Sequence, residues 1–244
     1  MADGVSALLT RIDALGGYFR IQPGAAPVTD GWRPLRELVT PPEQLSGRMT
    51  TARRGLAAAA SVAPADVDLR AAASAVHLGL VARLVSPVVA AAVIGDTVLD
   101  LHPDRTWWRP PADGEPSFSL RMPQPTGVAA PAAAGQAEAF ARFLLAPVLL
   151  PLEDALYQAA RVSRHVLRGN LVSALNGAAT VLVGTLPTSR RPAERLLRAL
   201  LQVPELAGTG WFDEGGLFHR RSCCLFYRVP GGGLCGDCIL VART

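Results

Sequence analysis

The placement of the cysteines constrains this chain more than any other feature of its sequence. All four, Cys223, Cys224, Cys235 and Cys238, lie in one short segment, in the pattern C-C-x10-C-x2-C. Four thiolates can complete a tetrahedral zinc site or hold the two irons of a 2Fe–2S cluster. The segment must therefore fold back on itself so that the thiols from its two ends can meet.

The spacing predicts how this return is made. Cys235-Gly236-Asp237-Cys238 is a C-x2-C metal knuckle with a glycine inside its turn, and the glycines at 231–233 allow the chain to double back. Neighbouring side chains of an extended strand point to opposite faces, so the Cys223–Cys224 pair predicts an irregular turn. A zinc ribbon usually has two C-x2-C pairs, which this chain lacks. Spacing alone leaves a 2Fe–2S cluster, a zinc ion and unmetallated thiols open.

Composition excludes several classes of function. All 24 Lys+Arg positions are arginine, so a P-loop or a Schiff-base lysine is ruled out. No G-x-G-x-x-G follows a predicted strand, and no G-x-S-x-G occurs, so we expect neither a bound nicotinamide or flavin nor a hydrolase nucleophile. The net charge of +4 is dispersed, which argues against nucleic-acid binding. Weak peripheral association with an anionic membrane surface is compatible with that charge.

The apolar segments indicate a cytoplasmic protein. The N-terminus carries an early Asp3 and no apolar run typical of a signal peptide. The stretches 84–94 and 171–186 are short or interrupted for membrane spans, so we expect buried core helices there. In the cytoplasm thiols stay reduced, and a cysteine cluster more often binds metal than forms disulfides.

The predicted fold is α+β: a predominantly α-helical body with short strands and a small irregular C-terminal iron–sulfur lobe. Residues 1–207 form the body, with an insert rich in strands and loops near 95–131, and residues 208–244 form the lobe that holds the cysteines.

Within the body, proline and glycine predict the helix ends. A helix that Asp68 could cap should stop or kink at Pro87, and the apolar run 88–94 could be helix or strand. The helix 136–150 should break at Pro147 or Pro151. The stretch 152–186 should be a long helix or a helix pair, with Gly169 and Gly177 as possible breaks.

The segment HRRSCCLFYRVPGGGLCGDCIL resembles the C-terminal signature of the FhuF-type ferric-siderophore reductases. Two weaker similarities lie upstream, from Ser74 through Leu84 and from Arg164 through Leu175, although Arg168 stands where that family commonly has an aromatic residue. The resemblance implies that the four cysteines bind a 2Fe–2S cluster. It also implies one-electron reduction of ferric iron held in a siderophore, most often of the hydroxamate type.

The residues around the cysteines suggest supporting roles. Arg221 and Ser222 adjoin Cys223 and could donate hydrogen bonds to sulfur, which would raise the cluster potential. Arg164 and Asn170 are candidates for contact with an anionic or carbonyl-rich substrate. With no nucleotide site of its own, the chain would need a ferredoxin or a flavoprotein as electron donor. Two alternatives are a 2Fe–2S electron carrier or redox sensor, and a noncatalytic interaction module with a structural zinc site.

Overall fold

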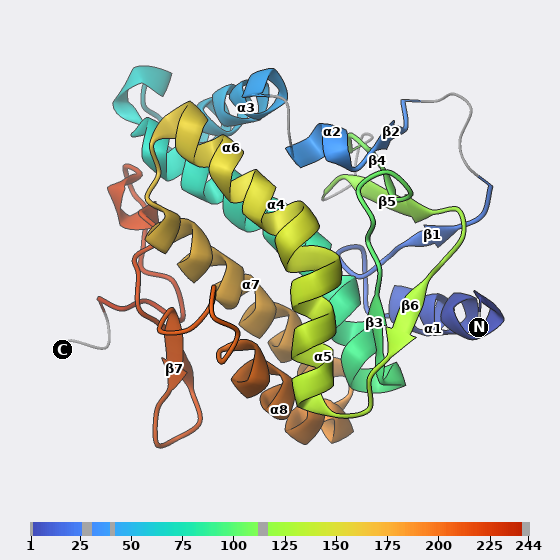
Figure 1. Ribbon diagram of the computed structural model, residues 1–244. Coiled ribbons are helices and arrows are strands. Elements are labelled where there is room, and N and C mark those ends of the chain that lie inside the picture. Colours follow the sequence, from blue (N-terminus) through green and yellow to red (C-terminus); the bar gives the residue numbers. More distant parts are fainter. Residues whose placement is uncertain (1, 26–30, 40–41, 112–116, 241–244) are drawn as a thin grey trace.

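The computed structural model describes residues 2–25, 31–39, 42–111 and 117–240, and it confirms a helix-dominated α+β fold (Figure 1). Its α-helices are α1 (Ala2–Asp13), α2 (Arg36–Val39), α3 (Pro42–Ala60), α4 (Leu69–Gly95), α5 (Ala133–Phe140), α6 (Leu150–Ala160), α7 (Arg164–Thr185) and α8 (Arg190–Leu200). Its strands are β1 (Gln22–Pro23), β2 (Arg33–Pro34), β3 (Thr97–Leu99), β4 (Trp107–Arg109), β5 (Ser119–Met122), β6 (Gly127–Ala129), β7 (Gly210–Phe212) and β8 (Phe218–Arg220).

Helices α4 and α7 form the centre of the body and pack side by side. By length and composition alone each could cross a membrane, but most of the apolar window of each is already buried, 67% for α4 and 56% for α7. Their apolar side chains face α1, α3, α6 and α8 in one hydrophobic core. The prediction of buried core helices at 84–94 and 171–186 agrees with this packing.

Pro87 does not end its helix, so of the predicted stop or kink the stop is wrong. It lies inside α4, which continues as α-helix through 88–94 to Gly95. An interior proline removes one backbone hydrogen bond and costs about 3 kcal/mol. Val85, Val88 and Val89 are all buried around it, and burying such side chains gains roughly 1.5–3 kcal/mol each. Tertiary burial therefore outweighs the local cost.

The predicted helix breaks in the second half of the chain are also displaced. Helices α5 and α6 are joined without interruption by a π-helical segment, Ala141–Leu149, that contains Pro147. The break comes instead at Arg161, whose φ of 55° is left-handed, and Ser163 then caps α7 by accepting a hydrogen bond from the His165 N–H at 3.3 Å. Gly169 and Gly177 both lie within α7, so neither ends a helix.

The insert near 95–131 forms short strands, as the sequence indicated, within its described residues 95–111 and 117–131. Strands β1, β5, β4 and β2 make a four-stranded sheet in that order, with β1 parallel to β5 and the other pairs antiparallel. Strands β3 and β6 pair antiparallel beside it. Arg83 fastens this layer to α4, because its guanidinium donates to the backbone carbonyls of Tyr18, Arg20 and Phe118.

His77 predicts a specific acid sensitivity. It is fully buried in α4, neither ring nitrogen has a hydrogen-bond partner among the described residues, and burial lowers its pKa to about 3. The unfolded chain binds a proton near pH 6.5, whereas the folded chain does not, so stability falls as pH drops below 6.5. This group alone should cost about 2 kcal/mol between pH 7 and pH 5.

The measurement is chemical denaturation of His77→Leu and the parent chain at both pH values. The parent should lose about 2 kcal/mol more than the variant on acidification. Burial raises the pKa of Glu153 to about 7 against the opposing charge of Arg168, and this contributes a slope of opposite sign to both proteins. The difference between them therefore isolates His77, and identical slopes would contradict the assignment.

Candidate metal centre

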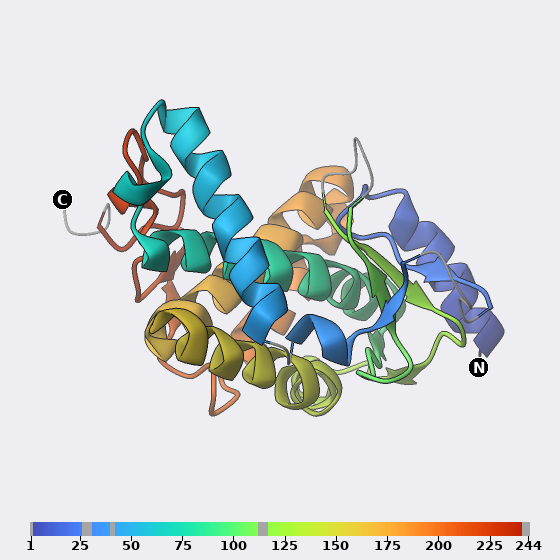
Figure 2. The same cartoon turned by 90° about the horizontal axis from the view of Figure 1, so that it is seen from above.

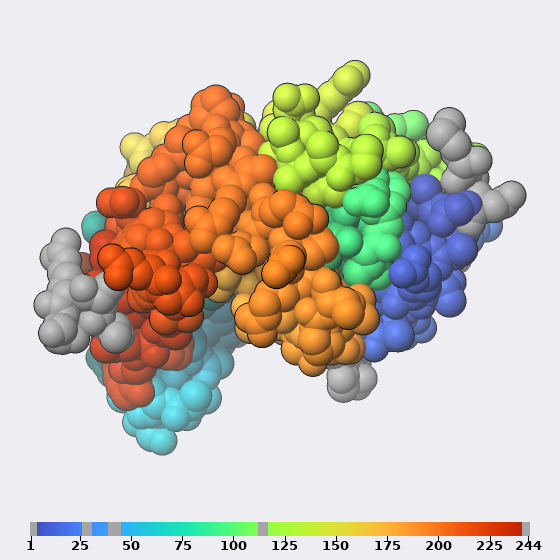
Figure 3. Space-filling view, turned by 90° about the horizontal axis from the view of Figure 1, so that it is seen from below, coloured from blue at the N-terminus to red at the C-terminus, as the bar shows by residue number. Residues whose placement is uncertain are grey.

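The cysteines lie in a lobe seated on one end of the helical body. In the space-filling view, residues 208–240 cover that end (Figure 3). The lobe begins with the antiparallel hairpin β7–β8, and the Arg221 N–H donates to the Thr209 carbonyl at 2.8 Å. Strand β8 packs on α7, and the short helical turn Phe226–Arg228 packs on α4.

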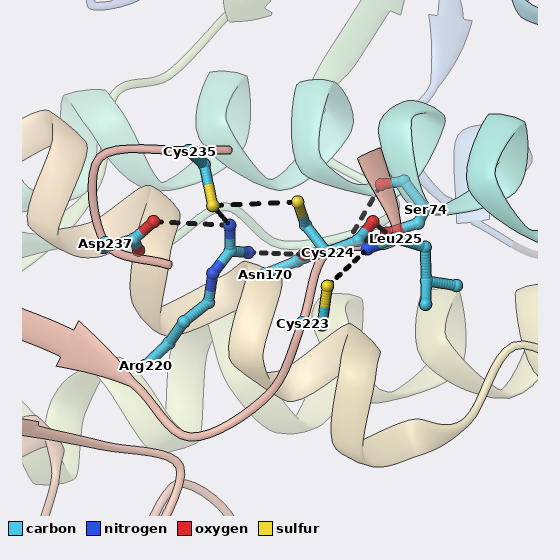
Figure 4. Close-up of polar contacts among 8 residues, drawn as sticks. All are labelled: Ser74, Asn170, Arg220, Cys223, Cys224, Leu225, Cys235 and Asp237. Carbon is cyan, nitrogen blue, oxygen red and sulfur yellow. Dashed lines mark hydrogen bonds and ion pairs between the residues drawn. The ribbon is translucent and has the colours of Figure 1, made fainter. Parts of the chain in front are cut away.

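Two of the four cysteine sulfur atoms lie close together without forming a disulfide. The Sγ atoms of Cys224 and Cys235 are 3.8 Å apart (Figure 4). Two thiolates bound to one tetrahedral metal ion at about 2.3 Å each are separated by about 3.8 Å. The loop from β8 to the C-x2-C turn therefore brings one sulfur from each half of the motif to the spacing of two ligands on one metal.

The adjacent cysteines do not share this pairing. The Cys223 sulfur accepts a hydrogen bond from the Leu225 N–H at 3.4 Å (Figure 4). Leu225 has a left-handed backbone with φ 66°, which confirms the irregular turn predicted at the pair. Besides burial, the nearness of Cys224 and of the buried Cys238 raises the pKa of Cys223.

The spacing of the Cys224–Cys235 pair fits two ligands of one metal ion, either a zinc ion or one iron of a 2Fe–2S cluster. Among the described residues, no group of three or more His, Cys, Asp or Glu side chains lies close enough together to hold a metal ion. A 2Fe–2S cluster needs two thiolates on each iron. If the Cys224–Cys235 pair binds one iron, Cys223 and Cys238 would be the ligands of the other.

A buried arginine stands behind the paired sulfurs. Arg220 is only 1% exposed, and its guanidinium donates to the Cys235 sulfur, to Asn170 Oδ1 at 3.0 Å and to Asp237 Oδ1 at 3.3 Å (Figure 4). Burial alone would lower its pKa, but Asp237 and the two thiols outweigh burial and raise it. A fixed positive charge therefore lies against the sulfur of Cys235, a predicted metal ligand.

The network continues into the two central helices. The Asn170 amide nitrogen of α7 donates to Ser74 Oγ at 2.8 Å and to the Ser74 carbonyl at 3.1 Å. The Ser74 hydroxyl of α4 in turn donates to the Cys224 carbonyl at 2.7 Å. Ser74 and Asn170 belong to the two upstream segments that the resemblance singled out, and both face the cysteine loop.

The thiol pKa values follow from this setting. The hydrogen bond from Cys235, together with the Phe226 N–H and Arg220, lowers the pKa of Cys224 to about 5 against the effect of burial. The pKa of Cys235 is raised, because it donates to Cys224 and because a second thiolate would stand 3.8 Å from the first. Burial raises the pKa of Cys223. This setting therefore favours a thiolate at Cys224 and disfavours additional thiolates at Cys223 and Cys235.

Not every predicted side chain lies in this network. Arg221 is exposed and stacks over Trp211 at 5.0 Å, and the Ser222 hydroxyl is buried without a partner among the described residues, so neither donates to sulfur here. Arg164 pairs with Asp154 at 2.8 Å and lies over Tyr157 at 4.3 Å. Asn170 has no exposed surface. Substrate contact by Arg164 and Asn170 stays a prediction.

Arg220 is the functional residue that sequence reasoning missed. Two consecutive arginines, Arg220 and Arg221, give no sign by residue type of which one is buried. The alternation of strand β8 supplies that sign, since Phe218 and Arg220 are buried and His219 between them is less so. Its partner Asp237, inside the C-x2-C turn, is the second signal.

Gly169 allows the lobe to seat on α7. A Cβ built at Gly169 would lie 1.8 Å from Ser222 Oγ and 3.1 Å from Ser222 Cβ. Gly169→Ala is therefore expected to destabilise the protein by about 1–3 kcal/mol in denaturant unfolding, despite the better helix propensity of alanine. Ser222→Ala removes the closer atom, so the double variant should recover part of that loss. Equal stability of Gly169→Ala and the parent would show that the contact is looser than the structure has it.

Comparison with known proteins found a family match for one segment of the chain. Residues 220–238 match the family model described as the FhuF 2Fe-2S C-terminal domain. No curated protein matches the chain. The matched residues contain all four cysteines, Arg220 and Asp237, so the family resemblance is confirmed for the segment that builds the metal centre.

Proposed function

We propose that this protein is a 2Fe–2S ferric-siderophore reductase, which transfers one electron to Fe(III) held in a siderophore and so releases Fe(II). The family match over 220–238 supports the class of protein. The observation that carries the proposal is the Cys224–Cys235 sulfur pair at 3.8 Å, with a buried arginine behind it, inside that matched segment.

The residues present would divide the work as follows. Cys223, Cys224, Cys235 and Cys238 would hold the cluster, which when bound supplies one-electron redox chemistry. Arg220 places a positive charge beside the Cys235 sulfur. Reduction would add negative charge to the cluster, so this arginine would favour the reduced state. Cys223 and Cys235 are only half-buried, so the centre lies near the surface, where electrons can enter and leave.

The reaction balances with one external reductant. One electron from a ferredoxin or a flavoprotein reduces Fe(III) to Fe(II). No bond of the siderophore skeleton breaks. The hard oxygen donors of the siderophore bind Fe(II) less tightly than Fe(III), so the reduced iron is released. No side chain is required as nucleophile or general acid. We place the reaction in the cytoplasm, with a ferric hydroxamate siderophore as the first substrate to test.

The test begins with anaerobic purification. Absorption spectra before and after dithionite, with iron, sulfide and zinc assayed on the same sample, should show visible bands that bleach and about two irons per chain. Adding a ferric hydroxamate siderophore to the reduced protein should restore the bands as Fe(II) is trapped by a ferrous chelator. A colourless protein with one zinc would refute the proposal, and a coloured protein that no ferric siderophore reoxidises would be an electron carrier or sensor.

A further inference from the structure

A cavity of about 590 Å³ opens between α3, α4 and the four-stranded sheet, away from the cysteines. Figure 2 shows α3 crossing over α4 beside these strands, with the C-terminal lobe at the start of α4. The volume is in the range of small-molecule sites, and the lining is mainly apolar. The lining residues used below are Arg48 on α3, Ala75, Val76 and Gly79 on α4, Trp108 on β4, and Phe118.

One cation in this lining lacks a counter-charge. The Arg48 guanidinium lies 4.9 Å from the centre of the Trp108 ring and 5.9 Å from that of Phe118. It makes no ion pair or hydrogen bond within the part of the chain that the structure describes. Burial lowers its pKa, which shows that its water shell is already reduced. A partly desolvated arginine over two aromatic rings is suited to an anion with a flat face.

The cavity also lies across one helix from the metal centre. Ser74, which hydrogen-bonds the Cys224 carbonyl, immediately precedes Ala75 and Val76 in α4. At 100° per residue, Ala75, Val76, Gly79 and Leu80 centre on the helix face opposite Ser74. A helix is about 10–12 Å across, and Ala75 and Gly79 make it thin here. A ligand in the cavity would therefore be separated from the cysteine loop by one helix.

We propose that this cavity binds an anionic ferric chelate, with a flat unsaturated arm of the chelator held between Arg48 and the cavity wall. The inference rests on the proposed function and narrows its substrate from the hydroxamate type that the family resemblance implies to chelates with a net negative charge. An unpaired cation selects chelates that carry net negative charge, such as ferric catecholates, over neutral ferric trihydroxamates. The site would place the ferric ion across α4 from the cysteine loop, with only that helix between them.

Gly79 offers a way to fill the cavity without disturbing the fold. A Cβ at Gly79 would meet nothing within 4 Å, and the same is true of Gly55, an exposed residue of α3 outside the cavity. Gly79→Leu should therefore block the site, while Gly55→Leu serves as the matched control. Arg48→Met keeps an apolar stem beside the rings and removes the charge.

The probe is the gallium(III) complex of a tris-catecholate, which binds as the ferric complex does but accepts no electron, measured by calorimetric titration. We expect Gly79→Leu and Arg48→Met each to weaken its binding at least tenfold, and Gly55→Leu to leave it unchanged. The neutral gallium trihydroxamate should bind the parent more weakly and be insensitive to Arg48→Met. Thermal unfolding of each variant verifies that it is folded.

The outcomes separate this proposal from the function on which it rests. If Gly79→Leu binds the gallium tris-catecholate as the parent does, the cavity is not the site, although the reduced protein can still be reoxidised by ferric chelates. A neutral complex that binds as tightly as the anionic one overturns the charge selection. If the parent binds neither complex and no ferric chelate reoxidises it, both the site and the reductase function are refuted.

Discussion

Cys224→Ala is expected to abolish the metal centre. The variant should lack visible absorption, and its iron content should fall from about two atoms per chain to background after anaerobic purification. The reason is geometric, because Cys224 belongs to the only described sulfur pair at the spacing of two ligands on one metal. Reduction of ferric siderophores should fall to the rate without protein. Iron and sulfide assays with an absorption spectrum are sufficient to measure the effect.

Arg221→Ala provides the control for this loss. Arg221 is two residues before Cys223 but stacks on Trp211 instead of contacting sulfur, so this variant should keep its colour and its iron. Cys235→Ala should reproduce Cys224→Ala, because the two sulfurs form one pair. A Cys224→Ala protein that retained about two irons per chain would remove Cys224 from the ligand set.

Arg220→Gln should lower the reduction potential of the centre by about 60–130 mV. A hydrogen bond to a charged group contributes about 1.5–3 kcal/mol, and in a one-electron couple 59 mV corresponds to a tenfold change in equilibrium constant. Reduction adds negative charge beside the guanidinium, so removing the buried cation disfavours the reduced state. Spectroelectrochemical titration measures the shift directly.

The neighbouring arginine again gives a matched comparison. Arg221→Gln removes the same charge from an exposed position and should shift the potential by far less, because solvent screens it. Arg220→Lys should restore part of the potential but not the three-way contact with Cys235, Asn170 and Asp237. Equal shifts for Arg220→Gln and Arg221→Gln would show that the buried arginine has no special role.

The sequence predicted the shape of the cysteine loop well because the determinants of that loop are local. The four cysteines, the return of the chain and the irregular turn at Cys223–Cys224 all follow from residue types and spacing within one segment. The body was harder, because its helix ends depend on packing. Pro87 and Pro147 were expected to end helices, yet burial of the surrounding side chains keeps both within helical structure.

The supporting residues could not be predicted because their partners are distant in sequence. No residue near Ser222 in the sequence indicates that Ser222 packs against Gly169 of α7. Likewise, Arg220 and not Arg221 is the buried arginine because Arg220 contacts Asn170, which is 50 positions away. The two weak upstream similarities lie on α4 and α7, and they gave no sign that Ser74 and Asn170 would support the cysteine loop through hydrogen bonds.

The contacts of Ser74 and Asn170 with the cysteine loop have a consequence for biosynthesis. During translation, α4 and α7 leave the ribosome before residues 220–238, so the platform for the loop can fold before any metal ligand has been made. Insertion of the cluster then becomes a late event on a preassembled surface, and variants of Ser74 or Asn170 should accumulate as folded chains that mature poorly. In cells starved of iron, a chain without its cluster would therefore persist as a stable, folded precursor instead of being degraded as an unfolded protein.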